Sequence, residues 1–240
     1  MIRRIAVTGS SGFVGGALCA RIDREPGFRS VGIGRRDFAA GLPAEKLAGC
    51  EAVVHLAGES RSDDPAALYS INMDLTRRVA DAVRRTPGIR RILFGSTAHE
   101  DRAGAYHASK REGRALFDAL AAELGIEAVG VLMPNAFGPG GKPFYNSVVS
   151  TFCKLRAEGR PLPVHPDAGT VKLVEIGTLA DALFAAAAGP FPGNPLAVPH
   201  EYEEEVAGIA RLLETFDPEV RPEGRFAYDL WRCWKSFLQK

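Results

Sequence analysis

The stretch VTGSSGFVGGALCARI, residues 7–22, joins an apolar run to an amphipathic helix through a glycine-rich turn. Gly9, Gly12 and Gly15 recur at three-residue spacing, the pattern of a dinucleotide-binding turn. Gly9 permits the tight turn, Gly12 lets the backbone approach a diphosphate, and Gly15 lets the helix pack close to the strand. Unpaired N–H groups at the start of the helix complement the anion. We therefore expect a cofactor to contact Gly9, Ser11, Gly12, Phe13, Val14 and Gly15.

Short apolar runs alternate with helical patterns from residue 2 to about residue 133. The runs IAV, AVVHLA, RILF and AVGVLM are apolar without alternation, as expected for parallel strands that helices cover on both faces. The helical patterns extend from Phe13 to Arg24, from about Pro65 to Arg85, and from about Tyr106 to Leu124. This order predicts βαβ units and an α/β fold with a doubly wound parallel sheet of the Rossmann type.

The pattern changes after residue 133. Turn residues crowd MPNAFGPGGKPF, and two helical segments then flank the short strand VKLVEI within residues 146–188. A proline-rich connection leads to a charged amphipathic helix predicted over EYEEEVAGIARLLETF, residues 201–216, and to an aromatic tail. We expect a cofactor-binding domain over 1–135 and a small C-terminal substrate-binding part over 136–240, interleaved with the sheet in one compact unit.

Composition excludes several classes of partner. Thirty Lys and Arg against 29 Asp and Glu give a net charge of +1, so we expect neither nucleic acid nor an anionic membrane as a partner. No apolar run approaches the roughly 20 residues of a membrane helix. Four cysteines are scattered without Cys-x-x-Cys spacing, and the five histidines show no ligand spacing. The sequence predicts free thiols in the cytoplasm and no metal.

The residues after the second apolar run bear on the choice of cofactor. NAD-binding domains place an acidic residue about 20 to 25 positions after the glycine turn, where it holds the ribose 2′-hydroxyl. This chain has Gly34 there, followed by Arg35 and Arg36. Two guanidinium groups suit a 2′-phosphate, so NADP is expected ahead of NAD. Solvated loop arginines stay the alternative, because Asp37 follows directly.

Tyr106 and Lys110 stand four residues apart in a predicted helix. Positions i and i+4 share one helix face, so both side chains could serve one ligand. The spacing alone equally fits an exposed helix face.

Together the glycine turn, the His-Leu-Ala of AVVHLAG and the Tyr-x-x-x-Lys pair resemble the extended short-chain dehydrogenase/reductases, the NAD-dependent epimerase/dehydratase family. The resemblance implies that Thr97, with Ser96 beside it, Tyr106 and Lys110 form the catalytic set. Reducing a ketone leaves charge on its oxygen, and a phenol with its pKa lowered by an ammonium can protonate that oxygen. The lysine would also hold the nicotinamide ribose.

Other positions match family segments. His55 and the cofactor-lining residues Leu56, Ala57 and Gly58 follow the third apolar run, although a packed strand end explains them equally well. The resemblance makes Asn72 structural, places Pro134 behind the nicotinamide and brings Asn135 to the substrate diphosphate. Met133 replaces the arginine that is usual in the family.

The stretch from Met133 to Val164 is similar to one branch, the reductase domain of bifunctional capsular-polysaccharide enzymes. Those enzymes reduce C4 of a UDP-2-acetamido-2,6-dideoxy-hexos-4-ulose with NADPH. Tyr145, Asn146, Ser147 and Phe152 stand in register with the branch, and the short gap between Thr97 and Tyr106 also fits it. The substrate contacts expected from this resemblance are Ser96, Thr97, His99, Asn135, Lys142, Tyr145, Asn146 and Lys172.

The sequence therefore predicts a cytoplasmic NADPH-dependent oxidoreductase acting on a UDP- or dTDP-linked 6-deoxy-4-ketohexose. The resemblance also implies a homodimer. The sequence stops where a cupin domain would begin in the branch, so no cupin-dependent C3 epimerisation is expected on it. One alternative is an epimerase or dehydratase that holds NAD(P) tightly, although Ala98 and His99 replace the Asp-Glu pair of family dehydratases. The other is a non-catalytic NADP-binding regulatory protein.

Overall fold

The computed structural model describes residues 2–42 and 44–238, which form two compact units. The first unit contains the described residues up to Met133 together with Ala180–Val198, and the second contains Pro134–Leu179 and the described residues from Pro199 onward. The elements are β1 (Arg3–Thr8), α1 (Phe13–Arg24), β2 (Phe28–Ile33), α2 (Arg35–Ala39), a 3₁₀ turn (Ala44–Lys46), β3 (Ala52–His55), α3 (Pro65–Arg84), β4 (Arg91–Thr97), α4 (Ala105–Leu124), β5 (Glu127–Met133), β6 (Asn135–Phe137), α5 (Val148–Ala157), β7 (Thr170–Glu175), α6 (Ile176–Ala188), β8 (Leu196–Ala197), β9 (Tyr202–Glu205), α7 (Val206–Glu214) and α8 (Arg225–Leu238).

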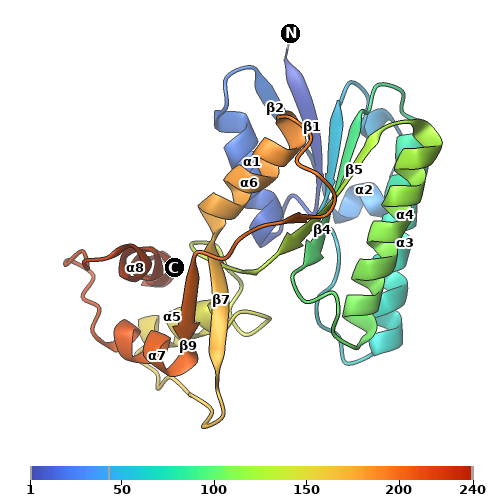
Figure 1. Ribbon diagram of the computed structural model, residues 1–240. Helices are drawn as coiled ribbons and strands as arrows, with labels where there is room; N and C mark the ends of the chain where they lie inside the picture. The colour runs from blue at the N-terminus through green and yellow to red at the C-terminus, as the bar shows by residue number, and fades with distance from the viewer. Residues whose placement is uncertain (1, 43, 239–240) are drawn as a thin grey trace. The chain divides into compact units, whose positions relative to one another are not determined.

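The first unit is built on a six-stranded sheet with the order β2-β1-β3-β4-β5-β8. Every neighbouring pair in it is parallel. In Figure 1, α3 and α4 lie side by side on one face of the sheet, and α1 lies on the other. The predicted doubly wound α/β fold is confirmed. Because helices cover both faces, strands such as β3 are buried along their whole length.

The core under α3 and α4 is apolar. Val53 and Ile92 of the sheet pack with Val79 of α3 and with Phe117 and Leu120 of α4, all at most 1% exposed. Each such side chain contributes about 1.5–3 kcal/mol relative to an exposed one. This packing holds the carboxyl ends of β1, β3 and β4 together, where the expected site residues lie.

Local signals set the ends of these helices. Asp64 accepts the N–H groups of Ala66 and Ala67 at 2.9 and 3.0 Å, and Pro65 occupies the first helical position of α3. Helix α4 ends at Gly125, which adopts the left-handed conformation with φ +66°. These caps explain why the sequence located both helices to within one residue.

The second unit contains a three-stranded sheet with the order β6-β7-β9, in which β6 and β7 are parallel and β9 is antiparallel. Its core joins Phe137 of β6 and Phe152 of α5 to Leu213 of α7 and Trp234 of α8. The aromatic tail of the sequence is thus helix α8, which buries its apolar face in this core.

One prediction about an element was wrong. The helix predicted over residues 201–216 begins only at Val206, because Tyr202–Glu205 forms strand β9 and pairs with β7. Arg35 and Arg36, for which a solvated loop was the alternative interpretation, are exposed and lie in the short helix α2. Within residues 2–42 and 44–238, no helix combines the length and apolar character needed to cross a membrane.

Candidate active site

The glycine turn after β1 is tightly packed. Gly9 has φ +68°, and a Cβ there would lie 3.0 Å from the Ala57 nitrogen. A Cβ on Gly15 would lie only 2.1 Å from the Gly9 carbonyl oxygen, so α1 approaches the turn as closely as a glycine allows. The Gly12 N–H donates to the Gly9 carbonyl at 2.8 Å. The backbone can pack this closely because glycine stands at each point of contact. The resulting turn at the start of α1 fits a dinucleotide diphosphate.

A cavity of about 350 Å³ lies beside this turn within the first unit. Its lining includes these residues expected to hold a cofactor: Gly9, Ser11, Gly12, Arg35, Leu56, Ala57 and Gly58. Phe38 of α2 and Ile71 and Leu75 of α3 add an apolar wall that the sequence analysis did not anticipate. Phe13 and Val14 form the start of α1 and are half-buried, and Arg36 is exposed in α2.

Asp37, the acidic residue closest to the two arginines, is engaged within the protein. Its Oδ2 accepts the Gly34 N–H at 2.9 Å, and its Oδ1 pairs with Lys46 Nζ at 2.9 Å. The Gly34 hydrogen bond and the Lys46 ammonium lower the pKa of Asp37. Arg35 is exposed and belongs to the lining of the cavity, whereas Asp37 is half-buried and does not belong to it.

His55 stands at the end of β3 and is 1% exposed. Thr8 Oγ1 accepts the N–H groups of Leu56 and Ala57, so its hydroxyl proton points to His55 Nδ1, 2.7 Å away. The ring proton is therefore on Nε2, which faces Thr76 Oγ1 at 3.4 Å. Burial, with a contribution from the charge of Lys110, lowers the pKa of His55 to about 3. The neutral imidazole thus orients the Thr8 hydroxyl, and Thr8 in turn holds the loop that lines the cavity.

Asn72 of α3 joins the loop after β3 to α4. Its Oδ1 accepts the Glu59 N–H at 2.7 Å, and its Nδ2 donates to the Glu59 carbonyl at 2.9 Å. Nδ2 also lies 3.1 Å from Ser109 Oγ, whose hydroxyl donates to the Tyr106 carbonyl at 2.7 Å. The cavity loop and the helix turn that carries Tyr106 are therefore tied to one another.

Tyr106 lies in the first turn of α4, and Lys110 one turn later. Lys110 is 9% exposed, and its Nζ donates to the Gly95 carbonyl of β4 at 2.9 Å. The ammonium lies 5.6 Å from the centroid of the Tyr106 ring. Burial lowers the pKa of Lys110 to about 8, although the negative charge of Glu100 opposes that shift. The structure thus places a cation of lowered pKa beside a half-buried phenol.

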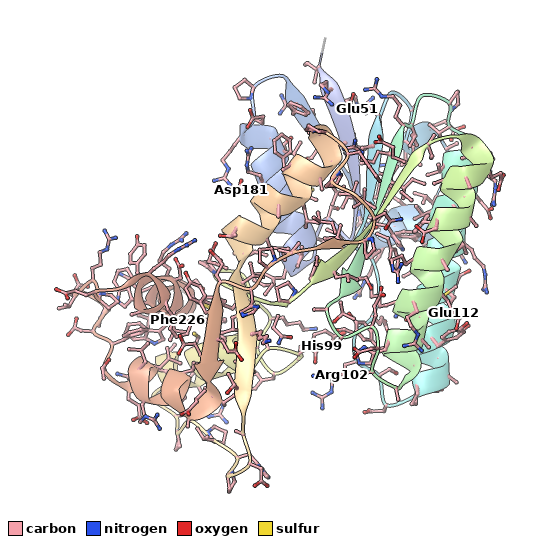
Figure 2. The ribbon with its side chains drawn as sticks, in the orientation of Figure 1. Glu51, His99, Arg102, Glu112, Asp181 and Phe226 are labelled. Carbon is pink, nitrogen blue, oxygen red and sulfur yellow. The ribbon has the colours of Figure 1, made fainter. Side chains whose placement is uncertain are left out.

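Thr97 ends β4 and is half-buried, and its Oγ1 accepts the His99 N–H at 3.2 Å. Ser96 is 2% exposed, and its hydroxyl donates to Glu100. Figure 2 shows His99 and Arg102 on the loop between β4 and α4. Glu100 was missed by the sequence analysis, although it is an acidic residue only three positions after Thr97 at the end of β4.

The remaining expected substrate residues belong to the second unit. Lys142 and Tyr145 lie together on the loop before α5, with the Lys142 Nζ 4.4 Å from the Tyr145 ring centroid. Asn146 and Asn135 are exposed, the latter at the start of β6. Lys172 is exposed on β7 opposite Glu203 of β9, and Pro134 directly precedes β6. The expected substrate residues of this unit therefore carry two amides, one phenol and two ammonium groups.

A second hollow, of about 430 Å³, lies at the amino ends of the strands in the first unit. Its arginines are paired: Arg3 with Glu51 at 2.5 Å, Arg90 with Glu51 at 2.7 Å, and Arg91 with Glu127 at 2.5 Å. Ligands of open α/β sheets bind at the carboxyl ends of the strands, so the cavity at the glycine turn is the candidate site. Among the described residues, no group of three His, Cys, Asp or Glu side chains is placed to hold a metal ion.

Sequence comparison matches residues 5–194 to the family described as the NAD dependent epimerase/dehydratase family. The chain is 28% identical over 214 residues to a UDP-2-acetamido-2,6-beta-L-arabino-hexul-4-ose reductase of Pseudomonas aeruginosa. That alignment covers 89% of this chain and 57% of the relative.

Two solved structures have similar folds. The capsular polysaccharide assembling protein CapF of Staphylococcus aureus superposes with a TM-score of 0.82 at 25% identity, over 98% of this chain and 65% of CapF. A UDP-glucuronic acid 4-epimerase of Bacillus cereus in complex with NAD gives a TM-score of 0.85 at 16% identity, over 98% and 96% of the two chains. The chain spans less than two thirds of the length of the reductase and of CapF.

Proposed function

The chain belongs to the NAD-dependent epimerase/dehydratase family, the extended short-chain dehydrogenase/reductases, and from this premise we propose that it reduces a nucleotide-linked sugar ketone. The proposed reaction is reduction of the C4 ketone of a UDP- or dTDP-linked 6-deoxy-4-ketohexose by NADPH. The observation that carries the proposal is the buried Lys110 ammonium, held by the Gly95 carbonyl and facing the ring of Tyr106. Similarity to the Pseudomonas aeruginosa reductase supports the substrate class.

The proposed chemistry assigns one task to each side chain. When bound, the reduced nicotinamide would supply a hydride to the ketone carbon, and the phenol of Tyr106 would give its proton to the ketone oxygen. Lys110 stabilises the tyrosinate, which then regains a proton from solvent. The Thr97 hydroxyl donates to the ketone oxygen and orients the carbonyl. The products are an alcohol and the oxidised cofactor.

Glu100 is the first acidic residue after Thr97, and its state of ionisation favours a reductase over a dehydratase. A dehydratase needs an acid/base pair that exchanges protons with carbon and oxygen. Burial alone would raise the pKa of Glu100, but hydrogen bonds from Arg114 and Ser96 outweigh it and lower that pKa. A carboxylate so held stays ionised and is a weak base, which suits a structural role.

NADPH is preferred to NADH in this proposal because Arg35 belongs to the lining of the cavity while Asp37 is bound by Lys46. We expect Arg35→Ala to raise the KM for NADPH about tenfold or more, since a charge-assisted hydrogen bond contributes roughly 1.5–3 kcal/mol. The KM for NADH should not change. Arg85→Ala, which removes an exposed arginine at the end of α3, is the control. Equal KM values for the two cofactors in the unmodified protein would contradict the preference.

The function is tested by incubating the protein with NADPH and a panel of UDP- and dTDP-linked 4-keto-6-deoxy sugars. Absorbance at the nicotinamide band measures turnover, and product analysis gives the configuration at C4. Stoichiometric loss of NADPH with one of these ketones is the expected result. Tightly held nucleotide in the purified protein, with interconversion of C4 epimers and no net NADPH loss, would favour an epimerase instead.

We further propose that the first unit binds the cofactor and the second unit binds the nucleotide sugar. Lys142 and Lys172 would meet the diphosphate, with Tyr145, Asn146 and Asn135 as hydrogen-bonding partners. The homodimer implied by the family resemblance stays a prediction.

A further inference from the structure

The loop from Ala98 to Gly104 joins two of the proposed catalytic residues. It leaves Thr97 at the end of β4 and enters α4 just before Tyr106, with only eight residues between those two positions. It consists of turns and bends, with one internal backbone hydrogen bond, from the Arg102 N–H to the His99 carbonyl at 3.1 Å. Side chains outside the loop must therefore contribute to its conformation.

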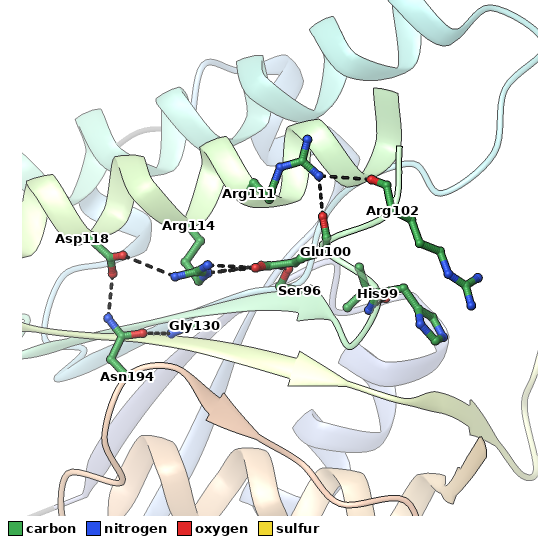
Figure 3. Close-up of polar contacts among 10 residues, drawn as sticks. Ser96, His99, Glu100, Arg102, Arg111, Arg114, Asp118, Gly130 and Asn194 are labelled. Carbon is green, nitrogen blue, oxygen red and sulfur yellow. Dashed lines mark hydrogen bonds and ion pairs between the residues drawn. The ribbon is translucent and has the colours of Figure 1, made fainter. Parts of the chain in front are cut away.

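Glu100 is the anchor of this loop. Arg114 Nη2 donates to Glu100 Oε2 at 2.9 Å, and Arg114 Nε lies 3.2 Å from both carboxylate oxygens. The hydroxyl of Ser96 in β4 donates to Glu100 Oε1. The Glu100 side chain is 12% exposed, so this is a largely desolvated pair rather than a surface one. Figure 3 shows the Glu100 side chain pointing toward Arg114, whereas the side chains of His99 and Arg102 point away from Arg114.

A second arginine of α4 holds the loop backbone. Arg111 Nη1 donates to the Glu100 carbonyl and lies 3.2 Å from the Arg102 carbonyl. Arg111 and Arg114 stand one and four positions after Lys110 in the same helix. The helix that carries Lys110 therefore also fixes the loop that leads to Tyr106.

Arg114 is braced on its other side. Gly130 of β5 leaves room for its side chain, because a Cβ at Gly130 would lie 2.1 Å from Arg114 Cδ. Arg114 Nη1 lies 3.9 Å from Asp118 Oδ2, and Asp118 Oδ1 accepts from Asn194 Nδ2 at 2.7 Å. Asn194 Oδ1 accepts the Gly130 N–H at 2.9 Å, which closes the chain of contacts drawn in Figure 3. Arg114 thus has little freedom to leave Glu100.

The same carboxylate is the negative group that acts on Lys110. Lys110 bonds to the Gly95 carbonyl, and the next residue of β4, Ser96, bonds to Glu100. The other titratable groups that act on or face the ammonium are His55 of β3, which is neutral, and the Tyr106 phenol of α4. Burial lowers the pKa of Lys110, and the charge of Glu100 raises it again.

We propose that Glu100 is a positioning residue: braced by Arg114 and Ser96, it fixes the loop between Thr97 and Tyr106 and places a negative charge near the Lys110 ammonium. The assignment rests on the proposed function for the roles of Thr97, Tyr106 and Lys110. Glu100 itself transfers no proton in this scheme.

Two substitutions separate this role from a merely structural one. Glu100→Gln removes the negative charge, so the titration midpoint of Lys110 should fall by about 1 pH unit. Arg114→Met leaves the charge of Glu100 uncompensated, so the midpoint should rise. Both variants break the same ion pair, and a structural effect alone would move the midpoint in the same direction in both.

The midpoint is measured by NMR titration of protein labelled with ¹³C at the lysine ε-carbon, with Lys110 assigned from Lys110→Arg. The chain has only seven lysines, which makes that assignment practical. Glu123→Gln is the matched control. It removes an exposed carboxylate of α4 that accepts from two nitrogens of Arg84, just as Glu100 accepts from two nitrogens of Arg114. It should leave the Lys110 midpoint unchanged.

This titration uses neither cofactor nor substrate, so its outcome is independent of whether the ketone reaction is the right one. Identical midpoints in Glu100→Gln, Arg114→Met and the unmodified protein would overturn the proposal. Shifts of the same sign in both variants would overturn it as well. If Glu100→Gln does not fold, Arg114→Met decides alone, since only an upward shift agrees with the proposal. In the active enzyme, the alkaline limb of kcat/KM should move in the same two directions.

Discussion

The chemistry expected of the Tyr106 phenol depends on the charge of Lys110, and burial of Lys110 sets the pKa of that group. Lys110 is nearly enclosed and has a pKa of about 8. It is therefore mostly a cation at pH 7 and loses its charge as the pH rises through about 8. A buried cation stabilises an anion formed next to it, because the Coulomb attraction between the two charges is larger where the dielectric constant is low. That physical effect is what a proton-donating phenol requires from its neighbour.

Removal of the proposed proton donor, the Tyr106 phenol, should lower turnover without weakening cofactor binding. We expect Tyr106→Phe to lower turnover by about 10²- to 10⁴-fold, the usual range for loss of a general acid. The Kd for NADPH, measured by fluorescence titration, should change little because the ring and its packing are retained. Turnover within a factor of two of the unmodified enzyme would exclude Tyr106 as the donor.

His55 should make stability fall in acid. Its pKa is about 3 in the folded protein, whereas an unfolded histidine titrates near 6.5. Between these values the unfolded chain binds a proton that the folded protein excludes, so the free energy of unfolding falls as pH drops below about 6.5, by up to about 1.4 kcal/mol per pH unit. Urea unfolding at pH 7 and pH 5 measures this loss.

His55→Gln should lose less stability than the unmodified protein between those two pH values, because its side chain does not titrate. Carboxylates titrate in both proteins and cancel in the comparison. His165→Gln, at a residue whose side chain is 76% exposed, should behave like the unmodified protein. Parallel losses in all three proteins would contradict a buried neutral imidazole.

At the scale of the element, α1 closely approaches the glycine turn, whose residues Gly9, Ser11 and Gly12 line the cavity. Neighbouring glycines in this helix have opposite constraints. A Cβ at Gly15 would overlap the Gly9 carbonyl at 2.1 Å, whereas a Cβ at Gly16 would meet the Ser10 carbonyl oxygen at an ordinary 3.5 Å. Only the first of these glycines is required by packing.

Gly15→Ala should therefore reduce stability by roughly 1–3 kcal/mol, the usual cost of forcing a group into a packed site. It should also weaken NADPH binding, because α1 must move away from the turn. Gly16→Ala in the same helix should instead stabilise by up to about 1 kcal/mol, since alanine is the better helix former. Urea unfolding compares the two variants, and equal effects would show that α1 does not closely approach the turn.

Strand β9 illustrates how an element is decided by its partner. Residues 202–205, Tyr-Glu-Glu-Glu, precede a good helix pattern and carry helix-forming glutamates. In the structure Tyr202 pairs with Leu173 and Glu203 with Lys172 on β7. The Tyr202 hydroxyl also donates to Asp229 Oδ2 of α8 at 2.7 Å. These contacts outweigh a helix propensity of a few tenths of a kcal/mol per residue.

At the scale of the whole molecule, the first unit is assembled from two separate segments of the chain. Ala180–Val198 belongs with residues up to Met133, and β8 within it pairs with β5 through Val131 and Leu196. The apolar run AVGVLM indicated that β5 is a buried strand. No local pattern indicated that a two-residue strand from beyond residue 190 would cover its edge.

The proposed assignment of cofactor binding to the first unit and of nucleotide-sugar binding to the second can be tested by hydrogen exchange. NADPH at 100 times its Kd should stabilise the binding unit by about 2.7 kcal/mol and slow exchange there. We expect that protection in the glycine turn, in α2 and in the loop after β3. A nucleotide diphosphate without the sugar should instead protect the loop before α5. Cofactor protection confined to residues 199–238 would overturn the assignment of the first unit.

The helices α1, α3 and α4, the parallel strands, the glycine turn and the i,i+4 spacing of Tyr106 and Lys110 were all determined by the sequence. These features depend on residues that are close together in the sequence, because hydrophobic period, helix capping and glycine conformation are all local signals. Only the tertiary structure decided that Lys110 is buried, that Asp37 is taken up by Lys46, that Glu100 is held by Arg114, and that residues 202–205 form a strand. Each of these results from a contact between segments distant in sequence, whose free energy exceeds the local preference and leaves no periodic signal in the chain.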